Sequence, residues 1–265
     1  MADRPDGAGG IQSLDQALRV LVALARHDRA ASLSELARDC GMPASKVHRY
    51  LASFLNAGFV RQAERSGKYD LGPAAIETGL SALNRHDFVN RTADALPGLA
   101  AETGLTALLC VWGNFGPTVV RWERAASLVA ASLGLGTALP LLTSATGRVF
   151  LAYLPEAVTA ALRREELAEA AASGRPLGDI GPDEAGVRTL AATVRAEGHA
   201  TVDGRYIPGL IAMAAPILDW QAQAQAVVTL IGTDPRAIAT DAPALARLKA
   251  FCATLSITGA DGATS

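Results

Sequence analysis

Residues 36–60 read LARDCGMPASKVHRYLASFLNAGFV, and this stretch decides the fold of the first part of the chain. A helical run ends at Gly41, because glycine adopts the left-handed backbone conformation at a helix end at little cost. Pro43 then stands where a first-turn proline is tolerated, so a new helix can start at once. One apolar stripe runs along this new helix, formed by Val47, Tyr50, Leu51, Phe54 and Leu55. The stretch therefore predicts two short helices joined by a sharp turn.

The residues before this turn predict two helix starts. A helical period of apolar side chains indicates a first helix from Ile11 to about His27. Its members are Ile11, Leu14, Leu18, Leu21 and Ala25. Ser32 and Glu35 have the spacing of a capping box, which predicts a second helix from Leu33 to about Cys40. The three predicted helices form a helix-turn-helix arrangement.

The face of the third helix opposite its apolar stripe is small and polar. It carries Ser45, Arg49, Ala52 and Asn56, and Lys46 and His48 flank its first half. Such a face suits a helix that enters a DNA major groove, which is roughly 12 Å wide. The alternative is an ordinary solvated helix face, which is what most charged faces are.

The segment after the third helix favours DNA binding. FVRQAERSGKYDLG (59–72) alternates apolar and polar residues around a Ser-Gly turn, which predicts a two-stranded hairpin with Arg65 and Lys68 at its tip. The chain as a whole has a net charge of −2, but residues 44–69 hold one acidic side chain and several basic ones. The basic ones are Lys46, Arg49, Arg61, Arg65 and Lys68. A basic hairpin after a helix-turn-helix is typical of a winged helix that contacts DNA.

Composition excludes several other classes of protein. The 265 residues are half hydrophobic, so the chain can bury a substantial core, but it contains no apolar run of about 18 residues. The N-terminus lacks the apolar core of a secretion signal. Cys40, Cys110 and Cys252 are scattered, which argues against a disulfide framework or a zinc site. We therefore expect a cytoplasmic protein without a metal and without a membrane span.

These motifs resemble the N-terminal DNA-binding domain of the IclR family of bacterial transcriptional regulators. The family pattern is L-x-E-L-A-x-x-x-G-[LM]-P-x-S-T-V-H-R-L-L. The chain matches it at Leu33, Glu35, Leu36, Ala37, Gly41, Pro43, Ser45, Val47, His48, Arg49 and Leu51. It departs at Lys46, where the family usually has threonine, and at Tyr50, where leucine is common. Because Lys46 borders the reading face, we expect its operator preference to differ from that of typical members.

The resemblance continues into the second half of the chain. LPLLTSATGRVFLAYLP (139–155) resembles the family segment P-L-H-x-[TS]-A-x-G-[KR]-A-x-L-A. GLIAMAAPILD (209–219) resembles the family strand I-A-A-P-[VI]-x-D. Leu142 stands where many members carry a histidine beside the effector pocket. This difference predicts a less polar pocket mouth.

The second half reads as alternating strands and helices, which favours a sheet flanked by helices. Strands are expected near 105–113, 117–124, 208–217 and 225–232, and helices near 144–153, 156–172, 183–197 and 241–257. The resemblance implies an α+β chain with five parts. These are a disordered start (1–10), a winged helix-turn-helix domain (11–71), a linker helix (72–91), a GAF-like α/β effector-binding domain (92–258) and a flexible tail (259–265).

The resemblance also implies the partners. Ser45, Lys46, His48 and Arg49 would contact a double-stranded operator, with Arg65 and Lys68 on the wing. The chain would act as a homodimer or a dimer of dimers and would control a catabolic operon. Its effector would be a small organic acid or an aromatic carboxylate, and no cofactor is implied.

Candidate effector-binding residues come from the same comparison of motifs and from their chemistry. Thr143, Thr146 and Gly147 match the family segment that approaches the effector. The later strands and two earlier ones supply the rest of the expected set, which is Trp112, Arg121, Asp203, Leu210, Ala212 and Thr229. Arg121 and Arg148 could pair with a carboxylate ligand, and the alternative for each is an ordinary surface charge.

Motifs typical of enzymes are missing from the sequence. It has no G-x-S-x-G elbow, no H-E-x-x-H and no Walker loop, and GLGTAL (134–139) lacks the third glycine of a dinucleotide turn. The chain is therefore not expected to be an enzyme. Two alternatives stay open at this point: an enzyme with a DNA-binding appendage, and a DNA-binding protein whose second domain only oligomerises.

Overall fold

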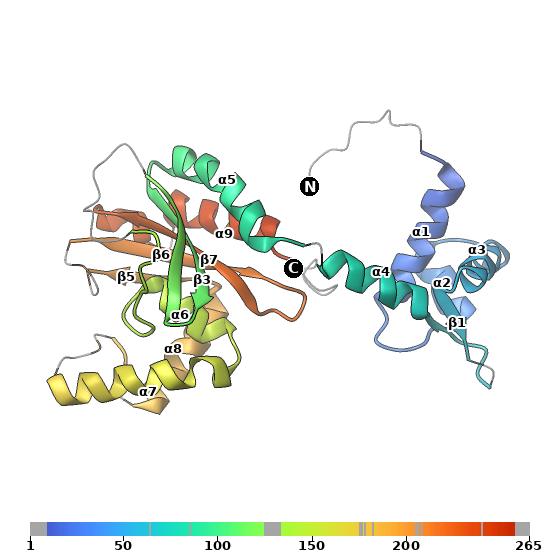
Figure 1. Cartoon of the computed structure of the whole chain (residues 1–265). Coiled ribbons are helices and arrows are strands. Elements are labelled where there is room, and N and C mark those ends of the chain that lie inside the picture. Colours follow the sequence, from blue (N-terminus) through green and yellow to red (C-terminus); the bar gives the residue numbers. More distant parts are fainter. Residues whose placement is uncertain are drawn as a thin grey trace. The chain divides into compact units, whose positions relative to one another are not determined.

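The computed structural model describes residues 10–63, 65–84, 86–124, 134–174, 177, 179–181, 183–204, 207, 209–239 and 241–257. The chain divides into two compact units, an N-terminal unit (Met1–His86) and a C-terminal unit (Asp87–Ser265). The described parts contain no helix that is both long enough and apolar enough to span a membrane. Figure 1 shows the elements of each unit.

The N-terminal unit is a helix-turn-helix followed by a small hairpin (Figure 1). Its elements are α1 (Gln12–Ala25), α2 (Leu33–Cys40), α3 (Ala44–Asn56), β1 (Val60–Gln62), β2 (Tyr69–Leu71) and α4 (Pro73–Asn84). The two strands pair antiparallel, with Arg61 opposite Asp70. One apolar core joins the helices and strands through Val20, Leu24, Ala31, Leu36, Val47, Leu51, Val60 and Tyr69. The predicted order of elements is confirmed.

Local chemistry sets the geometry of α2 and α3. Both hydrogen bonds of the capping box are present, because the Glu35 N–H donates to the Ser32 side chain and the Glu35 carboxylate accepts from the Ser32 N–H. Gly41 ends α2 with a φ of 61°, in the left-handed region. The Tyr50 hydroxyl donates to Gln16 Oε1 over 3.2 Å and so ties α3 to α1. Leucine, which is common at this position in the family pattern, could not form this hydrogen bond, so Tyr50 adds a contact between the two helices.

The expected single linker helix over 72–91 is wrong. Two helices occupy this region, because α4 ends at Asn84 and α5 begins at Phe88. Asp87 caps α5 through a hydrogen bond from the Asn90 N–H to its side chain, 2.9 Å long. An N-cap residue has non-helical backbone angles, so Asp87 marks the start of a new helix. The break also falls at the boundary between the two units.

The C-terminal unit is built on a five-stranded antiparallel sheet in the order β4-β3-β7-β6-β5. Its strands are β3 (Thr106–Gly113), β4 (Gly116–Glu123), β5 (Ala200–Asp203), β6 (Ile211–Leu218) and β7 (Ala224–Gly232). Its helices are α5 (Phe88–Thr103), α6 (Ala145–Tyr153), α7 (Glu156–Ser173), α8 (Glu184–Glu197), the 3₁₀ helix η1 (Pro235–Ile238) and α9 (Pro243–Leu255). The strands and helices predicted from sequence are present, whereas η1 and most of α5 were not predicted and no range was given for β5.

Helices cover both faces of this sheet (Figure 1). Side chains of α6 and α8 share one apolar cluster with Leu108 and Cys110 of β3. Side chains of α5 and α9 share the other with Ala107 and Leu109. Successive residues of a strand point to opposite faces, so β3 contributes side chains to both clusters. This is why its sequence is a continuous apolar run.

Candidate functional site

The outer face of α3 carries the residues expected to contact DNA. Ser45, His48 and Arg49 are exposed and Lys46 is half-buried, while Val47 and Leu51 are fully buried beneath them. Within the described part of the chain, the side chains of Lys46, His48 and Arg49 have no hydrogen bond or ion pair with the protein. Their donors are therefore available to an outside partner.

The wing presents its charges in two ways. Arg61 lies in an ion pair with Asp70, with Nη2 and Oδ2 2.7 Å apart, and this pair lowers the pKa of Asp70. Arg65 is exposed and Lys68 is partly exposed on either side of the turn. Neither side chain is paired among the described residues. Arg65 and Lys68 are thus the wing cations available to DNA, whereas Arg61 is occupied within the hairpin.

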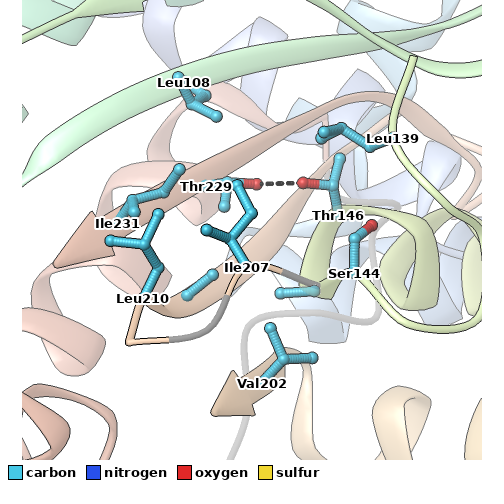
Figure 2. A pocket seen from close by; sticks show the side chains of 11 residues that line it. Leu108, Leu139, Ser144, Thr146, Val202, Ile207, Leu210, Thr229 and Ile231 are labelled. Atoms are coloured by element: carbon cyan, nitrogen blue, oxygen red, sulfur yellow. Dashed lines mark hydrogen bonds between the residues drawn. The ribbon is translucent and has the colours of Figure 1, made fainter. Parts of the chain in front are cut away.

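A pocket lies in the C-terminal unit between the N-terminus of α6 and the sheet (Figure 2). Its empty space amounts to about 410 Å³, including the part open to solvent. The lining residues are Leu108, Leu139, Ser144, Ala145, Thr146, Val202, Ile207, Leu210, Ala212, Thr229 and Ile231. Three hydroxyl groups stand among these otherwise apolar side chains. A mostly apolar cavity with a few placed polar groups is typical of a small-molecule site.

The hydroxyl groups of the pocket are held in place. Figure 2 shows Thr146 Oγ1 and Thr229 Oγ1 pointing at one another, 2.7 Å apart, so they join α6 to β7. Ser144 caps α6, because its Oγ accepts from the Gly147 N–H over 2.9 Å and donates to the Pro140 carbonyl over 2.5 Å. The polar groups are therefore fixed by the protein before any ligand arrives.

The turn that leads into α6 is anchored from two sides. The Glu166 carboxylate of α7 accepts from the N–H groups of Leu141 and Leu142, over 2.6 and 2.8 Å. Arg148 Nε donates to the Leu142 carbonyl over 2.9 Å. Burial raises the pKa of Glu166, and the charges of Glu169 and Glu165 add to this, against the lowering effect of the two backbone hydrogen bonds. The Glu166 side chain, by accepting both hydrogen bonds, holds the backbone of this turn in place beside the pocket.

Gly147 makes the close approach of α6 to this turn possible. A Cβ at this position would lie 2.5 Å from the Leu141 carbonyl oxygen and closer still to that of Pro140. Real side chains do not tolerate such distances to backbone atoms. Only glycine fits here. The close packing alone therefore explains the glycine of the motif, and no direct contact between Gly147 and a ligand is needed to explain it.

Two features that many enzymes use, a metal cluster and an ionised thiol, depend on metal-ligand side chains and on cysteines such as those of the core. The described residues contain no group of three or more His, Cys, Asp or Glu that could hold a metal ion. Burial raises the pKa of the Cys110 thiol to about 12, so it stays protonated at neutral pH. Cys252 is also fully within the core, and burial raises its pKa as well. Neither thiol is among the residues that line the pocket.

Comparison with known families decides the identity of the chain. Residues 13–64 match the model of the IclR helix-turn-helix domain, and residues 80–256 match that of the bacterial transcriptional regulator IclR C-terminal domain. The chain belongs to the IclR family. The family members are DNA-binding transcriptional regulators and not enzymes, which removes the enzyme alternative.

Individual members of the IclR family resemble the chain over most of its length. The transcriptional repressor IclR of Escherichia coli (strain K12) is 30% identical over 227 residues, which cover 84% of this chain and 81% of the relative. The glycerol operon regulatory protein of Streptomyces griseus is 30% identical over 237 residues, covering 89% and 91%. The crystal structure of Pseudomonas aeruginosa HmgR is 39% identical, covers 93% of this chain and 97% of its own, and has a TM-score of 0.79. The two-domain fold of the IclR family is thereby confirmed.

Four of the nine expected effector-binding residues line the pocket of this IclR-family chain: Thr146, Leu210, Ala212 and Thr229. The other five do not. Trp112 packs edge-on against Phe150, and Arg121 is exposed and paired with Glu123. Thr143 lies in the turn before α6, Gly147 packs against that turn, and Asp203 is exposed at the end of β5.

Two further expectations are corrected. Arg148 does not point to a ligand, because its guanidinium is buried and makes a two-bond pair with Asp179, 2.7 and 3.1 Å long. Leu142 is fully buried and is not among the pocket-lining residues, so it does not form the pocket mouth. Each of these side chains stabilises the turn beside the pocket instead.

The lining residues missed from the sequence are mostly apolar: Leu108, Leu139, Ser144, Ala145, Val202, Ile207 and Ile231. Strand pairing could have found two of them. Leu108 is opposite Thr229 in the β3–β7 register, and Ile231 follows Thr229 on the same face of β7. Ser144 carries the helix-cap signal of α6. The sequence alone does not reveal these pairings.

Proposed function

We propose that the chain regulates a catabolic operon in the cytoplasm by binding operator DNA as a dimer, and that a small organic acid in the pocket of the C-terminal unit modulates this binding. The observation that carries the proposal is the apolar pocket at the N-terminus of α6. Two related regulators of Streptomyces are named for the glycerol operon, which supports a metabolic target.

The chemistry of the pocket favours an acid with an apolar body. Ser144, Ala145 and Thr146 bring the first turn of α6 to the pocket. The first N–H groups of a helix have no partner within the helix, and its dipole favours negative charge. Leu108, Val202 and other aliphatic side chains would cover the remainder of the ligand. No basic side chain lines the described pocket, so the carboxylate would be held by N–H and hydroxyl groups.

A ligand that binds the folded protein must raise its melting temperature. A panel of small aliphatic and aromatic acids, each with its uncharged amide, should include an acid that stabilises the wild type while its amide does not. Thr229→Val should weaken that shift, and Arg121→Ala, which alters an exposed side chain outside the pocket, should leave it unchanged. If no acid stabilises the protein, the alternative that the second domain only oligomerises is supported.

Exposed apolar side chains support the proposed dimer. Within the N-terminal unit, Ile11 at the cap of α1 and Leu14, Leu18 and Val22 within it are exposed at helical spacing, and α4 exposes Ile76 and Leu80. Asp15 and Arg19 border the α1 stripe. In an antiparallel pair of α1 helices, Asp15 would lie near Arg19 of the partner subunit, and the same contact would recur by symmetry. A dimer also matches the two half-sites of an operator.

Sedimentation velocity tests this surface. Leu18→Glu would bury a charge in the proposed interface and should shift the protein toward the monomer. Val158→Glu alters an exposed apolar residue on α7 and is the matched control, with no expected shift. An unchanged mass for Leu18→Glu would place the dimer interface elsewhere.

A further inference from the structure

The side chains of α3 that face DNA differ in the direction in which they project. Val47 and Leu51 are fully buried, and the Tyr50–Gln16 hydrogen bond adds a polar tie to α1. The rotation of α3 about its own axis is therefore fixed. Each further residue advances by about 100° around an α-helix. The direction in which each exposed side chain of α3 projects from the helix axis therefore follows from its position in the sequence.

Ser45 and Arg49 lie one turn apart at the centre of the exposed face. Lys46 and His48 lie about 80° to either side of this centre. A helix seated in the major groove turns its outer face to the base edges, and its two flanks run beside the phosphates of the two strands. The arrangement on α3 thus has one central pair and one donor-bearing side chain toward each wall.

We infer that Ser45 and Arg49 read base edges, whereas Lys46 and His48 hold the phosphates on opposite walls of the groove. The inference rests on operator binding through α3. The chemistry of Arg49 and of Lys46 agrees with their places. Arg49 is exposed and unpaired among the described residues, and its planar fork can donate two hydrogen bonds to guanine O6 and N7. Lys46 is a compact charge on a flexible stem, which suits a phosphate.

The assignment predicts distinct effects for two substitutions that each alter one cation. Arg49→Lys keeps the charge and removes the fork, so it should reduce the preference for one base of each half-site by about tenfold while the salt dependence of binding stays the same. Lys46→Ala should weaken binding to all sequences alike and lower the slope of log K against log salt by about 1 for each protomer. The two variants serve as controls for each other.

Selection from a pool of randomised DNA duplexes tests the assignment without knowledge of the operator. The wild type should enrich a motif, Lys46→Ala should enrich the same motif, and Arg49→Lys should lose one position of it. The assignment is overturned if Lys46→Ala changes the motif or if Arg49→Lys enriches the wild-type motif. If the wild type itself enriches no motif, operator binding fails, and that result is distinct from a wrong assignment. Circular dichroism of each variant checks that the fold is retained.

Discussion

The two units of the chain carry their candidate functional residues in opposite ways. The N-terminal unit takes four of them from a single stretch, Ser45–Arg49, and projects them outward from one helix. The C-terminal unit assembles its pocket from β3, the turn before α6, β5, β6 and β7, and its polar lining groups are hydrogen-bonded to one another or to the backbone. Binding and stability should therefore be separable in the first unit and coupled in the second.

Gly147→Ala should have the largest effect on stability. The added Cβ would overlap with the carbonyl oxygens of Pro140 and Leu141, so the turn or α6 must move. We expect a loss of about 4 kcal/mol or more in the free energy of unfolding of the C-terminal unit. Thermal and urea unfolding would measure it.

Gly98→Ala is the matched control. Gly98 lies inside α5, and apart from its chain neighbours and the nearby backbone of that helix a Cβ there would meet no described atom within 4 Å. This substitution should stabilise the unit by about 0.5–1 kcal/mol, because alanine loses less backbone entropy than glycine in a helix. Equal stability of the two variants would mean that α6 does not pack as tightly on the turn as described.

Substitutions of Arg148 and Arg121 allow a buried and an exposed arginine of the same unit to be compared. Arg148→Ala would remove the bond to the Leu142 carbonyl and the pair with Asp179, and we expect a loss of about 2–3 kcal/mol. Arg121→Ala breaks the exposed pair with Glu123, which contributes about 0–1 kcal/mol. Chemical denaturation of both variants would show the difference. Similar losses would contradict the structural role of Arg148.

The pocket hydroxyls should show non-additive behaviour. Thr229→Val leaves the buried Thr146 hydroxyl with the Cys110 thiol as a weak partner, at a cost of about 1–2 kcal/mol. Adding Thr146→Val removes the stranded group, so the double variant should lose less than the sum of the two single variants. A double-mutant cycle of unfolding free energies measures this coupling. Strict additivity would mean that the two hydroxyls do not interact.

The contrast between the units explains which features could be predicted from sequence. The capping box at Ser32, the left-handed Gly41 and the apolar stripe of α3 are local, so spacing along the chain is sufficient to predict them. The break at Asp87 also has a local cause, since aspartate is a frequent helix cap.

The pocket depends on pairings between distant segments, and spacing does not reveal those. Leu108 and Ile231 line it because β3 pairs with β7, more than a hundred residues later in the chain. Arg121 and Arg148 are equivalent in the sequence as possible carboxylate partners. They differ in the structure because Arg148 is buried and paired with Asp179, and both of these features depend on the tertiary fold. Motif resemblance located the first turn of α6 and its Thr146, but it also included Gly147 and missed Ser144 and Ala145.

The smallest effect on stability is expected at the recognition helix. Arg49 is exposed and unpaired among the described residues, so Arg49→Ala should change the free energy of unfolding of the N-terminal unit by less than about 0.5 kcal/mol. Its binding to DNA should nevertheless fall, because the fork that contacts a base is lost. Unfolding and DNA titration of the same preparation would measure both quantities. A loss of stability comparable to that of Arg148→Ala would show that the outer face of α3 contributes to the fold, and the separation of binding from stability in this unit would then fail.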